Sequence, residues 1–194
     1  MIQAGDVIEN RVTGERLVFL KTSRETNGEA VVLETFVKPN GFVAAAHVHP
    51  HQEERFLILH GTFAFRLGRE RIVAGPGQRV TVPAGTAHKF WNTGDGEAHF
   101  VCEVRPALQF EQLIETMFGL AADVKTSRKG MPNPLRLAVI ARHHFDDVRL
   151  PFPPAWMQRM ALALGAPVGR VLGYQATYVP AGVDSAGQPV TESV

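Results

Sequence analysis

Two short segments that each begin with glycine carry the residues that most restrict how this chain can fold. Residues 41–61 begin and end with glycine and hold His47 and His49 as a His-x-His pair. Residues 77–92 begin with glycine and hold His88, which follows a Pro-x-Gly turn. Imidazole and carboxylate groups are the usual protein ligands of first-row divalent metals. A fold that uses these histidines together must bring the two segments, which are separated by 15 residues, against each other.

The alternation of side chains along a strand orders these candidate ligands. Residues two apart on a strand point to the same face, so His47 and His49 project together. Glu53 and Glu54 are neighbours, and only one of them can share that direction on an extended chain. His88 must come from a separate strand. Three imidazoles and one carboxylate would leave open positions on a six-coordinate metal, which is typical of a working site and not of a closed structural one.

The first half of the chain has the pattern of an all-β domain. Short β-branched and aromatic runs alternate with glycine, proline and asparagine, and such spacing is typical of a sandwich or a barrel. The predicted strands are residues 16–21, 30–37, 55–60, 62–66, 71–74, 79–82, 89–91 and 99–105.

After Pro106 the apolar residues recur with helical spacing instead. We expect helices over about residues 108–121, 135–142 and 155–164. Asn133 and Pro134 are predicted to be the N-cap and first residue of the second helix. The sequence therefore divides into a β-domain over residues 1–106 and a helical extension over residues 107–194, with a loose tail after about residue 179.

The two segments resemble the paired sequence motifs of the cupin superfamily. The first family motif is Gly, five residues, His-x-His, three or four residues, Glu, six residues, Gly. The second is Gly, five residues, Pro-x-Gly, two residues, His, three residues, Asn. The resemblance covers about residues 30–105. All ten fixed positions are present, as Gly41, His47, His49, Glu54, Gly61, Gly77, Pro83, Gly85, His88 and Asn92.

The resemblance implies a double-stranded β-helix, or jelly-roll, barrel with a metal inside it. It implies His47, His49, Glu54 and His88 as the ligands of one divalent transition metal. Iron or manganese is favoured, and nickel, zinc or copper are alternatives. Glu54 is preferred over Glu53 because only Glu54 leaves six residues before the closing glycine.

Four further residues are candidates for the substrate pocket. Phe56 shares the strand parity of Glu54, and Phe90 shares that of His88, so both are expected inside the barrel. Glu103 and Arg105 lie on one face of the predicted strand 99–105. That face is either turned to solvent or turned into the barrel, where the two residues would orient a substrate.

Charge and composition limit the partners that this chain can have. The net charge of +1 gives no electrostatic case for binding nucleic acid or an anionic membrane. The beginning of the chain lacks the pattern of a secretory signal, and its longest apolar window, residues 160–169, is too short to span a bilayer. We expect a cytoplasmic protein that binds a small molecule and forms a homodimer, with the helices as a cover, a lid or a dimer arm.

Three functions fit these features, so whether the chain is an enzyme stays open. The first is a metal-dependent dioxygenase or other oxygenase that acts on a small apolar or aromatic molecule, with Glu54 also acting as a base. The second is a non-catalytic module that binds or senses a small molecule. The third is a sugar isomerase or epimerase, which the apolar inward positions Phe56 and Phe90 make less favourable.

Overall fold

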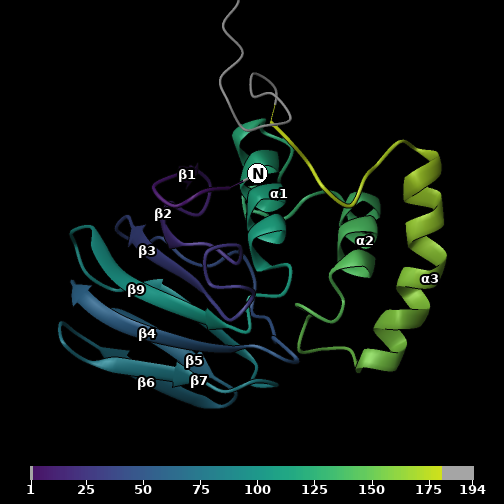
Figure 1. Ribbon diagram of the computed structural model, residues 1–194. Coiled ribbons are helices and arrows are strands. Elements are labelled where there is room, and N and C mark those ends of the chain that lie inside the picture. Colours follow the sequence, from purple (N-terminus) through teal and green to yellow (C-terminus); the bar gives the residue numbers. More distant parts are fainter. Residues whose placement is uncertain (1, 181–194) are drawn as a thin grey trace, which may run out of the picture.

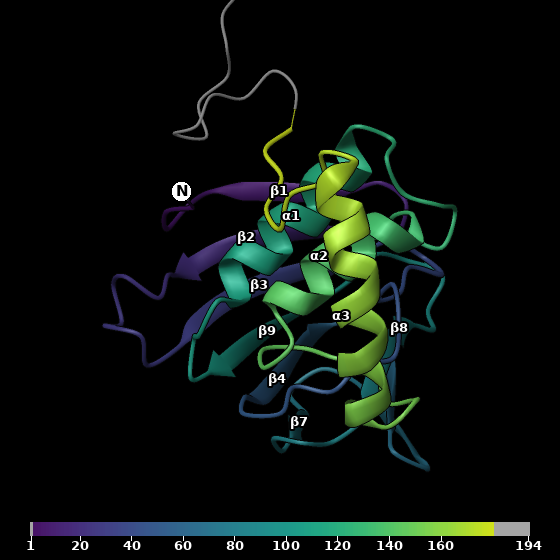
Figure 2. The ribbon, with the colours of Figure 1, turned by 90° about the vertical axis from the view of Figure 1, so that its right-hand side faces the viewer.

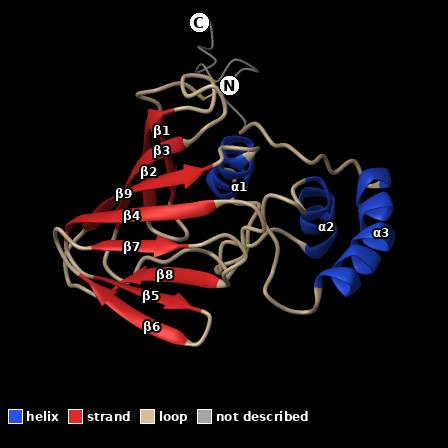
Figure 3. Cartoon of the chain, turned by 60° about the horizontal axis from the view of Figure 1, so that its bottom comes forward, coloured by secondary structure: helices blue, strands red, loops and turns tan. Residues whose placement is uncertain are grey.

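The computed structural model describes residues 2–180 and shows nine strands in two antiparallel sheets. The larger sheet has the order β1-β2-β3-β9-β4-β7, and the smaller has the order β6-β5-β8 (Figures 1 and 3). The strands are β1 (Val7–Asn10), β2 (Glu15–Lys21), β3 (Val31–Val37), β4 (Glu53–His60), β5 (Phe63–Leu67), β6 (Glu70–Ala74), β7 (Arg79–Val82), β8 (His88–Asn92) and β9 (Ala98–Arg105).

Aromatic side chains join the two sheets into a sandwich. Phe56 on β4 lies with its ring centroid 5.1 Å from that of Phe65 on β5. Phe100 on β9 lies 4.9 Å from Phe63 on β5. Because β3 and β9 bury every second residue, one face of each strand contributes to this core. The predicted all-β class is therefore confirmed as a two-sheet sandwich.

The segment before β4 belongs with the smaller sheet. Phe42 pairs with Trp91, and His47 pairs with His88, as isolated antiparallel bridges. Two backbone hydrogen bonds of 2.9 and 3.0 Å join His47 to His88. The two segments singled out by sequence therefore lie side by side.

Gly61 shows why the first motif ends in glycine. Its φ is +76°, a conformation that glycine adopts far more readily than other residues. A Cβ at this position would also lie 2.3 Å from the Cβ of Ala98 on β9. Only glycine allows the turn between β4 and β5 to pass so close to β9.

Three helices follow the strands. They are α1 (Phe110–Ala122), α2 (Pro134–His143) and α3 (Ala155–Val171). The predicted start of α2 is confirmed, because the side-chain oxygen of Asn133 accepts a hydrogen bond of 2.9 Å from the backbone N–H of Arg136.

Helix α3 continues past its predicted end at residue 164, through Pro167. A proline inside a helix leaves the carbonyl four residues earlier without its usual donor. Here the guanidinium of Arg142 on α2 donates to that carbonyl, Ala163 O, at 3.4 Å. Gly169 also lets the two helices approach closely, since a Cβ there would lie 2.6 Å from the Leu135 carbonyl oxygen. Packing against α2 therefore extends α3 beyond the limit that its own sequence suggests.

The helices lie in series on one side of the sandwich. Helix α1 lies next to the larger sheet, α2 follows, and α3 is outermost (Figures 1 and 3). Figure 2 shows the same three helices in front of the strands. None of the described helices is both long and apolar enough to cross a membrane. The predicted loose tail falls mainly on residues 181–194, outside the described part of the chain.

Candidate metal centre

Four side chains from the two motifs converge on one point. His47, His49, Glu54 and His88 each offer one ligand atom, and these atoms all lie within 4.8 Å of one another. His47 and His49 come from the segment before β4, Glu54 from β4 and His88 from the start of β8. His49, Glu54 and His88 are buried, and His47 is half-buried. The structure thus brings together the residues that the sequence selected as ligands.

The second nitrogen of each imidazole is held by a carbonyl oxygen. Nδ1 lies 2.9 Å from Ala45 O in His47 and 3.0 Å from Thr86 O in His88. In His49 it lies 2.8 Å from Asp147 O. Because a carbonyl can only accept, Nδ1 must carry the hydrogen in all three rings. The Nε2 atoms are then free to donate a lone pair, as metal ligands do.

Two of the atoms that face this point lack hydrogen-bond partners. Nε2 of His49 and Oε2 of Glu54 are buried without a hydrogen bond. Oε2 of Glu54 lies 2.6 Å from Nε2 of His88, and Oε1 lies 3.7 Å from Nε2 of His49. Buried polar atoms left unpaired are costly, and these are all electron donors. The donor set therefore fits a divalent transition metal.

Burial and the neighbouring charges shift the pKa values of these groups. Burial alone would raise the pKa of Glu54, but His49 and His88 outweigh it and lower that pKa to about 2. Burial and the neighbouring His88 and His49 lower the pKa of His47 to about 3. Burial would also lower the pKa of His88, yet the adjacent Glu54 carboxylate raises it above its ordinary value. At neutral pH the site therefore offers an ionised carboxylate and a neutral His47, which are the forms that bind metals.

The neighbouring glutamate and histidines lie outside this cluster. Glu53 points away from it and pairs with Arg55 at 2.6 Å. His51 and His60 are exposed. The choice of Glu54 from the spacing to Gly61 agrees with this geometry.

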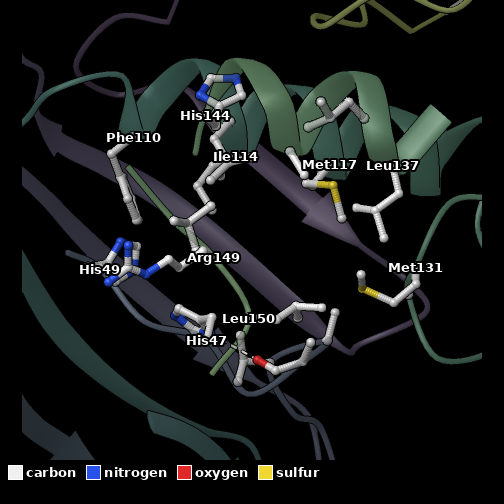
Figure 4. Close-up of a pocket in the computed structure, with 18 of the residues that line it drawn as sticks. His47, His49, Phe110, Ile114, Met117, Met131, Leu137, His144, Arg149 and Leu150 are labelled. Atoms are coloured by element: carbon white, nitrogen blue, oxygen red, sulfur yellow. Dashed lines mark hydrogen bonds between the residues drawn. The ribbon is translucent and has the colours of Figure 1, made fainter. Parts of the chain in front are cut away.

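A large and mainly apolar cavity opens beside the four ligands. Its volume is about 570 Å³, and His47, His49 and Glu54 are part of its lining. The structure places Phe56 and Phe90 in the same lining. Helices α1, α2 and α3, together with the loops that join them, contribute most of the remaining wall (Figure 4). The extension therefore helps to build the pocket.

The prediction that Glu103 and Arg105 reach into the barrel is wrong. Cys102 and Val104 on β9 are buried on the inward face, so Glu103 and Arg105 alternate onto the outer face. There Nε of Arg105 lies 2.9 Å from Oε1 of Glu103, and Arg55 lies 3.6 Å from the same oxygen. These residues form a surface ion-pair group instead of a substrate clamp.

The sequence analysis missed two groups that orient His49. The side-chain oxygen of Gln52 lies 3.0 Å from Nδ1 of His49. The hydrogen on Nδ1 is shared between this oxygen and Asp147 O. Nε2 of Gln52 donates to the carbonyls of Pro106 and Ala107 at 3.0 and 2.9 Å. Groups behind a ligand set its tautomer and its direction. Gln52 could have been found from its place in the motif, whereas Asp147, 98 residues from His49, had no local signal.

Three more polar residues in the cavity lining were also missed. Arg149 pairs through its backbone with Val48. His144, fully buried, lies with Nδ1 3.0 Å from Oδ2 of Asp147. Glu15 faces inward on β2, and burial raises its pKa to about 7. Glu15 could have been found from strand parity, because it alternates with the core residues Leu17 and Phe19.

Comparisons with known proteins point to the family of the β-domain. Residues 33–104 match the model of the Cupin domain family. A probable oxidoreductase, virH, of Hypocrea virens is 27% identical over 92% of this chain and 87% of its own length. Protein SchB of Streptomyces halstedii is 30% identical over 52% of this chain and 73% of its own length.

Among solved structures, a predicted oxalate decarboxylase from Thermotoga maritima has 18% sequence identity and a TM-score of 0.48. The match covers 55% of this chain and 98% of that one. The ten motif positions, the domain match and the similarity to SchB lead to one conclusion: this chain belongs to the cupin superfamily.

Proposed function

We propose that this protein is a metal-dependent oxygenase, of the dioxygenase type, that acts on a small apolar or aromatic molecule inside a jelly-roll barrel. The observation that carries the proposal is the convergence of three histidines and one carboxylate beside an apolar cavity, whose wall includes His47, His49 and Glu54. The name of the virH relative, a probable oxidoreductase, supports the same class of reaction.

The donor set selects the chemistry that a metal would supply here. Iron or manganese, which we favour over nickel, zinc or copper, would provide a redox centre and a Lewis acid. In a dioxygenase reaction both oxygen atoms of O₂ enter the substrate, so no external reductant is required.

The protein's own residues bind the metal and position the substrate. The carbonyls of Ala45, Thr86 and Asp147 aim the three imidazoles, and Glu54 supplies the negative charge. Phe56 and Phe90 give the substrate an apolar surface and exclude water.

A non-catalytic module that binds a small molecule is the second candidate. It is favoured by the low pKa of Glu54, about 2, which makes this carboxylate a good ligand but a weak base at neutral pH. A sugar isomerase is less well supported, because the mainly apolar lining offers few partners for sugar hydroxyls.

Metal analysis followed by oxygen uptake separates these functions. Protein purified without added metal is expected to contain about one iron or manganese per chain, as four converging ligands imply. It is then expected to consume O₂ with at least one member of a panel of small aromatics and diketones. Both atoms of ¹⁸O₂ should appear in the product.

Two outcomes would count against the oxygenase. Bound iron or manganese without any oxygen consumption would favour the binding module. A folded protein that holds no metal, even after incubation with Fe²⁺ or Mn²⁺, would contradict the site itself.

A further inference from the structure

Arg149 brings a positive charge to the wall of the metal cavity. Its backbone pairs with Val48, the residue between His47 and His49, through two hydrogen bonds of 2.8 and 3.0 Å. Figure 4 shows its side chain extending toward His49 within the cavity lining. Arg149 thus comes from the helical extension but lies beside the segment that carries two of the ligands.

No protein carboxylate neutralises this guanidinium in the described residues. Arg149 forms no ion pair with a described residue, and its guanidinium carbon lies 5.9 Å from the ring centroid of Phe145. It is also the only lysine or arginine among the described residues that line the cavity. Arg149 is half-buried, and an unpaired charge that is partly withdrawn from water is unfavourable until an opposite charge arrives.

The charges of the lining leave a positive excess once a metal is bound. Glu54 and Glu15 are the two carboxyl groups of the lining. Glu54 offsets one of the two charges of a divalent ion. Glu15 is partly neutral near pH 7 because burial raises its pKa to about 7. The remaining charge of the metal and that of Arg149 both favour an anionic ligand.

We propose that Arg149 binds an anionic group of the substrate, a carboxylate or an ionised hydroxyl on an otherwise apolar or aromatic molecule. The planar fork of a guanidinium matches a carboxylate with two parallel hydrogen bonds. This inference rests on the proposed function, because it assigns the charge of the substrate in the same cavity.

Benzoate and its neutral match benzamide test the inference by calorimetric titration of the Zn²⁺-loaded protein. Benzoate is expected to bind more tightly than benzamide. Arg149→Met should weaken benzoate binding about 10- to 100-fold, the effect of losing a charged hydrogen-bonded pair, and leave benzamide binding and zinc content unchanged. Arg149→Lys should recover part of the affinity, since it restores the charge without the fork.

The same titration of metal-free protein separates this inference from the proposed function. If Arg149→Met weakens benzoate binding there as well, Arg149 binds the anion whatever the metal does. If benzoate binds only when zinc is present, and equally well to Arg149→Met, the metal alone holds the anion and the inference is overturned. Equal affinities for the two probes, or no binding of either at millimolar concentration, would also overturn it.

A second and independent observation concerns the outer face of α3. Six large apolar side chains near four-residue spacing are at least half exposed there: Trp156, Met160, Leu164, Val168, Val171 and Leu172. We call this set the α3 stripe. The opposite face of α3 lines the cavity with Ala161, Leu162 and Gly165.

Helix α3 is therefore apolar on both sides. Its polar residues are Gln158, which is buried, and Arg159 and Arg170. A helix that is hydrophobic all round is normally buried on all sides. Yet α3 is the outermost helix of the described structure (Figures 1 and 3).

The size and charge of the α3 stripe fit a second copy of the chain. Six such side chains present on the order of 600 Å², close to the ~800 Å² that each partner buries in a stable interface. Arg159 pairs with Asp146 at 2.9 Å, so Arg170 is the one charged residue of α3 without an ion pair to a described residue. We infer that the α3 stripes of two copies pack against each other in a symmetric dimer.

Sedimentation velocity of the full chain, at about 1 to 100 µM, tests the dimer. The unaltered protein is expected to sediment as a dimer, and Leu164→Glu as a monomer, because the buried carboxylate would have no partner. Val73→Glu is the matched control, since Val73 is 55% exposed on β6, outside the stripe. Its dimer should persist.

A monomer at every concentration would overturn the dimer, as would an unchanged mass for Leu164→Glu. Association that begins only after removal of residues 181–194 would show that the chain covers its own stripe. Binding to neutral phospholipid vesicles by a monomer would assign the stripe to a lipid surface. Either result excludes the second copy as occupant.

Discussion

Alanine in place of His49 is expected to lower the affinity for the bound metal by at least about 100-fold, because a buried ligand and its lone pair are removed. Nε2 of His49 is buried and has no hydrogen-bond partner in the described structure. We therefore expect this nitrogen to bind the metal. Gln52→Leu should have a smaller effect of about 10- to 100-fold, since it removes one of the two groups that aim His49. Competition with a chromophoric chelator measures both affinities.

Exposed neighbours provide the matched controls for this experiment. His51→Ala makes the same substitution two residues away on an exposed side chain and is expected to leave metal affinity unchanged. Circular dichroism should show that His49→Ala keeps the fold. Equal metal affinity in His49→Ala and His51→Ala would contradict the metal centre.

The two adjacent glutamates extend the same test to the proposed base. Glu53→Gln alters a surface ion pair with Arg55 and should retain metal and activity. Glu54→Gln removes the anionic ligand, and this variant should lose most of the bound metal and most of the activity. If Glu54→Gln bound metal and kept full turnover, the role of Glu54 as a base would be wrong.

The second large effect is expected in the pH dependence of stability, and it comes from Glu15. Burial raises the pKa of this carboxyl from 4.5 to about 7. Below pH 4.5 the group is protonated in both the folded and the unfolded chain. Between pH 4.5 and 7 only the folded chain holds the proton, so the free energy of unfolding falls as pH rises, by roughly 3 kcal/mol in all. Above pH 7 the difference stays constant.

Glu15→Gln should remove this slope, because glutamine does not titrate. Urea denaturation of metal-free protein from pH 4 to 8 is expected to show the variant close to wild type at pH 4 and more stable by up to roughly 3 kcal/mol at pH 8. Glu70→Gln, on an exposed position of β6, is the control and should follow wild type throughout. Parallel curves for wild type and Glu15→Gln would refute the effect.

Local patterns predicted most of the strands, and their failures have physical causes. Strand β1 was missed because Val7 is exposed and Glu9 and Asn10 are polar, which gives the segment no apolar alternation. Its pairing with β2 holds it in place instead. The end of α3 was missed for the opposite reason. Gly165 and Pro167 predict a helix end, but contacts with α2 override them.

The candidate site likewise contains some residues that local patterns predict and others that they do not. The four ligands could be chosen from spacing because each lies in a motif where the local strand and turn fix its direction. The inward face of β9 was left open, since Glu103 and Cys102 alternate along the strand, and the burial of Cys102 in the folded sheet shows which of them is inside. Arg149 and Asp147 reach the site through pairing with distant residues, which no local pattern encodes.

The hydrogen bond from His49 to Asp147 O has a consequence for how this protein can be divided. The four ligands all precede residue 106, so a fragment or a grafted barrel that ends there would inherit the entire donor set. It would lack the carbonyl that helps to aim His49 and the backbone of Arg149 that pairs with Val48. The smallest transferable unit of this metal site therefore includes the chain through Arg149, and the boundary of the β-sheets is not the boundary of the site.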